Sequence, residues 1–226
     1  MADRYTLYEI ENLRDRFTLV DGVPAGVKKS YNVSPTQTIP VVVGENGVNH
    51  MQRMKWGFVP SNAKDLNSVF RYKTHRANSE GIFYKATWQD AIRTKRCLIP
   101  ANGFYEWKKT EDGKRAFYIH PDDQSLFAFA GLYGEWTDPA GTLWGVCAII
   151  TTATGSETDM LPSRLPVIVD PADEADWLNP NISDVSTLIR IMRPYDADQL
   201  VITRVGDEIN SLKIDKPSLI TPHFRQ

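Results

Sequence analysis

The chain has 226 residues, long enough to bury a substantial hydrophobic core. Its 26 Lys and Arg residues nearly balance its 28 Asp and Glu residues, giving a formal net charge of -2. This balance excludes a protein that attracts nucleic acid through its overall charge, so any such binding must rest on a local basic patch.

The cysteines and the amino-terminal region indicate the compartment. Cys97 and Cys147 lie far apart in sequence, each within an apolar stretch, and we interpret both as buried thiols of a reducing compartment. The chain shows no signal-peptide core and no apolar run of membrane-spanning length. We therefore expect a cytoplasmic protein without a membrane partner.

Metal and nucleotide chemistry find little support in the sequence. The four histidines are scattered and show no ligand spacing with the cysteines, so we expect neither a metal nor another cofactor. The G-x-x-x-x-G-K-[ST], G-x-G-x-x-G and G-x-S-x-G motifs are absent. The reactions that depend on those motifs are not expected.

The predicted elements begin with a helix over residues 7–17, where apolar side chains recur at helical spacing behind a Thr6–Glu9 capping box. Strands follow. Asn46-Gly47 favours a type I′ turn between strands at 38–44 and 48–59, and a second hairpin is expected at Asp112-Gly113, before RAFYIH.

Later segments complete the predicted fold. The apolar stretches at 125–136 and 143–152 predict antiparallel central strands. Further helices are expected at 85–94, at 171–178 behind Asp170, and at 184–192 behind Ser183. No repeat or linker divides the chain, so we expect a single α+β domain over residues 1–226, with a curved, barrel-like, largely antiparallel sheet and peripheral helices.

Glu106 is the first candidate for chemistry. In IPANGFYEWKK, strand alternation places it on one face with Phe104 and Lys108. A carboxylate on a half-buried aromatic face would have a raised pKa, which suits a general acid or base. A solvated glutamate paired with a lysine is the alternative, and the stretch alone favours it because most glutamates are exposed.

The segment FRYKTHRANSE, residues 70–80, is the second candidate. If it is extended, Arg71, Lys73 and His75 share one face, and cations interleaved with an aromatic ring can follow a phosphate backbone and stack a base. A charged edge strand that blocks unwanted pairing explains the pattern equally well.

Several motifs together resemble one family. They are YNVSPTQ, MKWGFVP, RCLIPANGFYEWKK, FAFAGLYGEW, AIITTAT, RLPVIV and MRPYDADQL, in order along the chain. This series is similar to the SRAP family of SOS-response-associated peptidases, or abasic-site-processing proteins. The resemblance implies one α+β domain around a barrel-like sheet, with a groove for single-stranded DNA.

The resemblance also implies a reaction. In the family, a cysteine exposed at position 2 condenses through its α-amine with the aldehyde of an abasic site, and its thiol closes a stable thiazolidine. A glutamate, an asparagine and a histidine assist, and the glutamate matches Glu106. The resemblance therefore favours an acid-base role for Glu106 over the solvated alternative.

The other catalytic positions depart from the family pattern. Position 2 is Ala2, so no thiazolidine can form and cysteine-type autoproteolysis has no nucleophile. The family's asparagine-alanine-arginine motif is exchanged, with Arg76 and Asn78 in reversed places. Pro162 stands where the histidine belongs, and Asp3 stands where glycine is usual. Such coordinated departures indicate natural divergence, as in a phage-borne or duplicated paralogue.

The resemblance implies that seven positions line the groove. They are Arg4, Asn32, Pro35, Arg76, Asn78, Thr151 and Arg164. Three functions remain open: a protein that binds single-stranded or abasic DNA without the durable crosslink; a lyase that uses the α-amine of Ala2 with Glu106, and with His75 replacing the lost histidine; and a pseudoenzyme that binds another protein, such as a host repair protein.

Overall fold

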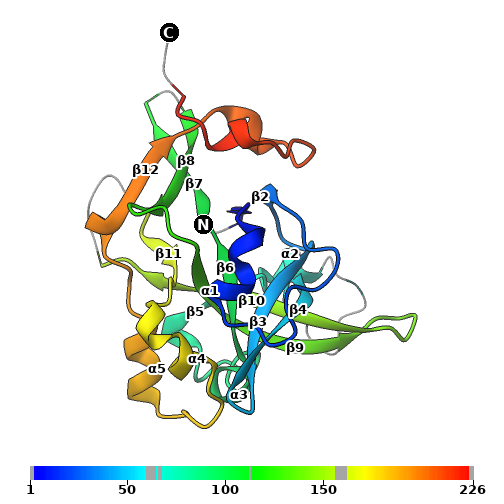
Figure 1. The fold of residues 1–226 in the computed structure, drawn as a ribbon. Helices are drawn as coiled ribbons and strands as arrows, with labels where there is room; N and C mark the ends of the chain where they lie inside the picture. Colours follow the sequence, from blue (N-terminus) through cyan, green and yellow to red (C-terminus); the bar gives the residue numbers. More distant parts are fainter. Residues whose placement is uncertain (1–2, 60–64, 66–67, 112, 156–161, 224–226) are drawn as a thin grey trace.

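The structure is a computed structural model that describes residues 3–59, 65, 68–111, 113–155 and 162–223 (Figure 1). The strands are β1 (Tyr5–Leu7), β2 (Ser30–Val33), β3 (Thr38–Glu45), β4 (Val48–Trp56), β5 (Arg76–Asn78), β6 (Arg96–Ala101), β7 (Gly103–Thr110), β8 (Gly113–Pro121), β9 (Phe127–Thr137), β10 (Leu143–Ala153), β11 (Arg164–Pro166) and β12 (Leu200–Arg204). The α-helices are α1 (Leu13–Arg16), α2 (Ser68–Tyr72), α3 (Ala91–Thr94), α4 (Glu174–Leu178) and α5 (Val185–Ile191).

Five strands close into a barrel. Their order is β10-β4-β3-β6-β9, and β9 also pairs with β10, which completes the ring. The ladders are antiparallel except where β10 runs parallel to β4 and β5. Closure leaves these strands without exposed hydrogen-bonding edges between them. The predicted α+β class with a curved, barrel-like sheet is confirmed.

A second sheet lies beside the barrel, in the order β12-β8-β7-β1-β2. One hydrophobic cluster joins the two sheets, since Tyr5 and Phe104 of the second sheet pack in the same core as Trp56 and Phe129 of the barrel. Helices α4 and α5 gather at the lower end in Figure 1, and the segment after β12 covers the upper end. The amino-terminal strand β1 is therefore held in the second sheet, against the core shared with the barrel.

The predicted hairpins agree with the structure. β3 and β4 form a hairpin whose ladder runs from the Thr38–Lys55 pair to the Glu45–Val48 pair. The turn residues Asn46 and Gly47 have φ values of 51° and 80°. Positive φ at both central positions is what a type I′ turn requires. β7 pairs with β8, and β9 with β10, as expected. Asp112, in the second predicted turn, lies outside the described residues.

The predicted helix over residues 7–17 is wrong in its first half. Leu7 ends strand β1, a 3-10 turn spans Ile10–Asn12, and only Leu13–Arg16 is α-helical. Thr6 does not cap a helix. Its hydroxyl forms a hydrogen bond with the Tyr118 hydroxyl at 2.9 Å. Pairing with β2 and β7 on both sides buries Tyr5–Leu7 completely, and this tertiary burial outweighs the local helical pattern.

The extended interpretation of residues 70–80 is also wrong. Residues up to Tyr72 form α2, Lys73 turns the chain with a φ of 54°, and only Arg76–Asn78 is a strand. Alternate residues therefore do not share one face across the segment.

The remaining helix predictions are partly right. The helix expected at 85–94 is limited to Ala91–Thr94. Asp170 caps the 171–178 helix as predicted, by accepting from the Ala172 amide. The cap of α5 is Asp184, one residue after the predicted Ser183.

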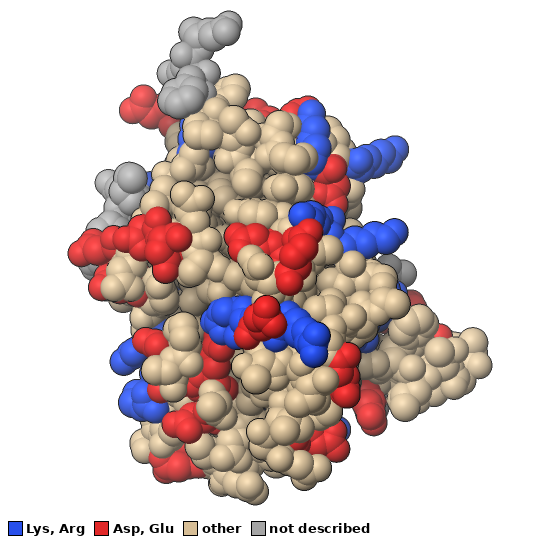
Figure 2. All heavy atoms as spheres, in the orientation of Figure 1, with Lys and Arg blue, Asp and Glu red and all other residues tan. Residues whose placement is uncertain are grey.

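The surface carries no dominant charge on the face drawn in Figure 2, where acidic and basic side chains are intermixed. This agrees with the formal net charge of -2. Among the described residues, no helix is long and apolar enough to cross a membrane.

Candidate functional site

The start of the chain lies beside the strand that carries Glu106. β1 pairs antiparallel with β7, and the Tyr105 amide donates to the Arg4 carbonyl at 3.0 Å. Because the strands are antiparallel, residues before Arg4 continue along β7 toward Glu106. A cavity of about 300 Å³ opens here, lined by Asp3, Arg4, Trp107, Lys114 and Asn210. A cavity therefore lies next to the amino-terminal segment.

Glu106 is buried in β7, with only 3% of its surface exposed. Its neighbours Phe104 and Tyr105 are fully buried. The alternative of a solvated glutamate is wrong, because pairing of β7 with both β1 and β8 shields this part of the strand. A carboxyl group so enclosed is suited to holding or transferring a proton.

Arg4 enters the cleft from a fixed position. Its guanidinium donates to Asn32 Oδ1 at 2.9 Å and to the Ile209 carbonyl at 3.2 Å. Asn32 in turn donates to the carbonyls of Ser211 and Ile214 at 3.0 and 2.7 Å. Asn32, 3% exposed, thus positions Arg4 and ties it to the carboxy-terminal segment.

Asn78, Thr151 and Arg164 are brought together by strand pairing. β5 and β11 both pair with β10, placing Asn78 opposite Thr151 and Arg164 opposite Ala153. Arg164 donates to the Thr151 carbonyl at 2.8 Å, and Thr151 Oγ1 donates to Asn78 Oδ1 at 3.2 Å. Three residues widely separated in sequence therefore form one hydrogen-bonded group.

Glu80 completes this group and was not predicted from the sequence. Arg164 binds its two carboxylate oxygens in a bidentate pair, each at 2.8 Å. Hydrogen bonds from Arg164 hold the pKa of Glu80 below its usual range. The sequence signal that could have identified Glu80 is its position in RANSE, two residues after the predicted groove residue Asn78.

Asp3 and Arg76, two of the departures from the family pattern, contact each other. Asp3 Oδ1 lies 3.1 Å from Arg76 Nη1 and 2.8 Å from His75 Nε2. Burial opposes ionisation of Asp3, but the hydrogen bond with His75 and the positive charges around it, of which Arg76 contributes least, outweigh it and lower the pKa of Asp3. The two departures are therefore physically coupled, a link that only their opposite charges could have suggested.

The remaining predicted positions contribute less to the cleft. Ala2 lies outside the described residues. Pro35 is buried in the turn between β2 and β3, two residues after the partner of Tyr5 in β2, Val33. Pro162 is half-buried, and its carbonyl accepts from the Thr154 hydroxyl at 3.2 Å.

Both cysteines are remote from this chemistry. Cys97 and Cys147 are free thiols with no exposed surface, as predicted. Burial raises the pKa of both, so the reactive thiolate is disfavoured. Cys97 and Cys147 are the two cysteines in the sequence, and because both are buried, neither provides a reactive thiol at the cleft.

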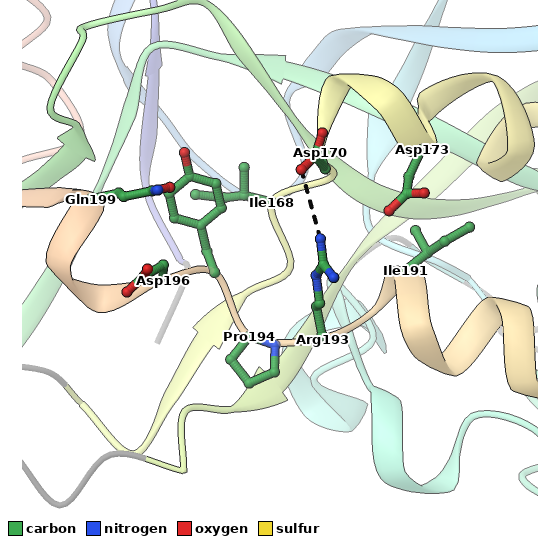
Figure 3. A pocket seen from close by; sticks show the side chains of 9 residues that line it. Ile168, Asp170, Asp173, Ile191, Arg193, Pro194, Asp196 and Gln199 are labelled. Atoms are coloured by element: carbon green, nitrogen blue, oxygen red, sulfur yellow. Dashed lines mark ion pairs between the residues drawn. The ribbon is translucent and has the colours of Figure 1, made fainter.

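Another pocket, of about 330 Å³, lies near α5 (Figure 3). Its acidic groups are already used by the fold: Asp170 caps a helix and pairs with Arg193 at 3.7 Å, and Asp196 caps the 3-10 turn Ala197–Gln199. Asp173 accepts from Arg190 at 2.8 Å. We assign no ligand to this pocket.

Comparison with known proteins identifies the family. Residues 1–212 match the model of the SOS response associated peptidase (SRAP) family. The chain belongs to the SRAP family. It is 35% identical over 226 residues to the abasic site processing protein YoqW of Bacillus subtilis (strain 168), covering 99% of this chain and 100% of that protein. The abasic site processing protein HMCES of Gallus gallus is 28% identical over 229 residues, covering 86% of this chain and 66% of its own.

Solved structures agree on the fold. A protein from Bacteroides thetaiotaomicron superimposes with a TM-score of 0.83 at 23% identity, covering 99% of this chain and 98% of that chain. The predicted SRAP fold is thus confirmed. Membership of a family whose curated relatives are named abasic site processing proteins supports a role in DNA damage for this SRAP protein.

Proposed function

We propose that this SRAP protein binds single-stranded DNA, including abasic DNA, in the cleft beside β1 and does so without forming a thiazolidine crosslink. The observation that carries the proposal is a cavity beside β1 that is lined by the cations Arg4 and Lys114 and by Asp3, which contacts Arg76. Arg4 is fixed by Asn32, Arg164 is fixed by Glu80 and Thr151, and Lys114 lines the cavity. Arginine and lysine side chains are the usual partners of DNA phosphates.

The binding constant tests the first half of this proposal. Fluorescence anisotropy with an abasic single strand, an intact single strand and heparin is expected to show preference for DNA and weakening with salt. Arg164→Gln is expected to lower DNA affinity about fivefold to tenfold. The matched control is Arg16→Gln, because Arg16 forms the same bidentate pair with Glu174. Equal affinity for DNA and heparin would contradict DNA binding.

A denaturing gel tests the second half. Incubation with abasic single-stranded DNA in the absence of reductant is expected to leave no heat-stable adduct. The comparison protein restores the family residues through Ala2→Cys, Arg76→Asn and Pro162→His. The Asp3–Arg76 contact argues for adding Asp3→Gly, since Arg76→Asn alone would remove the cation beside Asp3. A heat-stable adduct from the unaltered protein would refute the proposal.

A second candidate function is an abasic-site lyase, and the burial of Glu106 beside β1 favours it. Removal of Met1 would expose the α-amine of Ala2, which would attack the aldehyde carbon, and loss of water would give an imine. Removal of a C2′ proton would then break the C3′–oxygen bond and release the 3′ phosphate, with Glu106 accepting the proton.

Borohydride trapping tests the lyase. Glu106→Gln is expected to lower the rate of strand cleavage about a hundredfold, the usual loss when a proton-transfer group is removed, while the imine still forms and can be trapped. Glu135→Gln is the control, because Glu135 is an exposed glutamate on strand β9. No trapped adduct from the unaltered protein would end this candidate. Failure of both DNA binding and trapping would favour a protein-binding pseudoenzyme.

A further inference from the structure

Asp3, in the amino-terminal segment, places a carboxylate at the cleft. One carboxylate oxygen of Asp3 contacts both His75 Nε2, at 2.8 Å, and Arg76 Nη1, at 3.1 Å. The side chains of His75 and Arg76 are only 7% and 15% exposed, whereas that of Asp3 is 46% exposed. A half-exposed anion therefore covers two largely buried nitrogen donors.

The donors would recognise other anions equally well. An ionised carboxylate only accepts hydrogen bonds, so His75 Nε2 must carry the proton in this contact. His75 Nδ1 is buried without a hydrogen-bond partner among the described residues. A phosphodiester oxygen is likewise an acceptor with negative charge, and arginine binds both groups. The pair of donors thus has the chemistry of a phosphate site.

The backbone holds these donors in place independently of Asp3. The His75 carbonyl accepts from Trp56 Nε1 at 2.8 Å and from the Ile149 amide at 3.0 Å. Arg76 pairs with Ile149 in the β5–β10 ladder. Asp3, in contrast, precedes β1 and is joined to this wall through its side chain. The donors would therefore stay in position if Asp3 moved, and His75 Nε2 would then need another acceptor, because leaving a buried donor unpaired is unfavourable.

We propose that Asp3 is an internal substitute for a DNA phosphate, which occupies the His75–Arg76 site until a strand displaces it. This inference rests on the proposed DNA binding and adds its regulation. The site continues directly into the group formed by Asn78, Thr151 and Arg164, because Arg76 and Asn78 lie on the same three-residue strand. A DNA strand bound at Arg164 would thereby extend toward the position of Asp3.

Removing the charge of Asp3 tests this proposal. Asp3→Asn is expected to bind a labelled single strand of about 15 nucleotides about fivefold more tightly at low salt, because one competing ion pair is lost. Asp3→Glu, which keeps the charge, is expected to behave like the unaltered protein.

Two further variants make the test specific. Asp21→Asn removes the same charge from another Asp–His pair, the one with His50, and is expected to leave DNA affinity unchanged. In an Arg76→Gln background, Asp3→Asn is expected to give no gain. A gain that persists there would overturn the proposal, because the phosphate would not be using Arg76.

The outcomes separate the two proposals. If no variant prefers DNA to heparin, DNA binding itself fails. If DNA binds but Asp3→Asn leaves the affinity unchanged, only the internal phosphate substitute is refuted. A loss of thermal stability in Asp3→Asn without any gain in affinity would show instead that Asp3 merely fastens the amino-terminal segment.

Discussion

The carboxylates around the cleft differ in how they are held. Glu106 is enclosed by β-sheet, Glu80 is clamped by Arg164, and Asp3 bridges His75 and Arg76. The sequence pointed to Glu106 because a specific motif surrounds it. It could not reveal the other two contacts, because opposite charges are common in any sequence and only folding decides which of them meet.

Glu80 makes the pH dependence of stability a residue-scale prediction. Its folded-state pKa is lowered, mainly by hydrogen bonds from Arg164, so its contribution is present above the unfolded pKa of 4.5 and is lost as pH falls through the folded value. The side chain is 51% exposed, so solvent screening limits the contribution to below about 1 kcal/mol.

Urea unfolding of Glu80→Gln checks this prediction. The variant is expected to be slightly less stable than the unaltered protein at about pH 7, and the difference is expected to shrink at about pH 3. Glu135→Gln, an exposed strand glutamate, serves as the control. A difference of equal size at both pH values would contradict an ionic origin.

At the scale of elements, local signals succeeded where the chain itself decides the geometry. Asn46-Gly47 forms the expected turn because its backbone conformation is a property of those two residues. The predicted helix at 7–17 failed because Tyr5–Leu7 gain more by burial between β2 and β7 than by continuing a helix. The helix expected at 85–94 was predicted too long for the same reason, because periodicity alone does not show where packing begins or ends a helix.

The cap of α5 offers an element-scale prediction. Asp184 Oδ2 accepts from the Thr187 amide at 2.9 Å, whereas neighbouring Ser183 was the predicted cap. Asp184→Ala is expected to lower the free energy of unfolding by about 1 kcal/mol, and Ser183→Ala is expected to change it by only a few tenths. Chemical denaturation of both variants decides between the two residues. Equal losses would mean that the assigned cap is wrong.

At the scale of the whole molecule, the barrel joins strands that are distant in the chain. The sequence predicted the β9–β10 hairpin, but the ring also needs the parallel contact between β4 and β10, which has no local signature. The grouping of Asn78, Thr151 and Arg164 depends on the same long-range pairing. Family resemblance, rather than periodicity, was what placed these residues together.

Thiol accessibility is a whole-molecule prediction, because Cys97 in β6 and Cys147 in β10 are sealed by the closed barrel. A colourimetric disulfide reagent is expected to detect no thiol in the native protein and both thiols after unfolding. Rapid native reaction of the unaltered protein would contradict the burial of both side chains.

The closed ring contains no residue before Thr38. Substitutions at the very start of the polypeptide therefore leave the most cooperative part of the architecture untouched. Residues before β1 can therefore change during evolution while the closed ring keeps its structure.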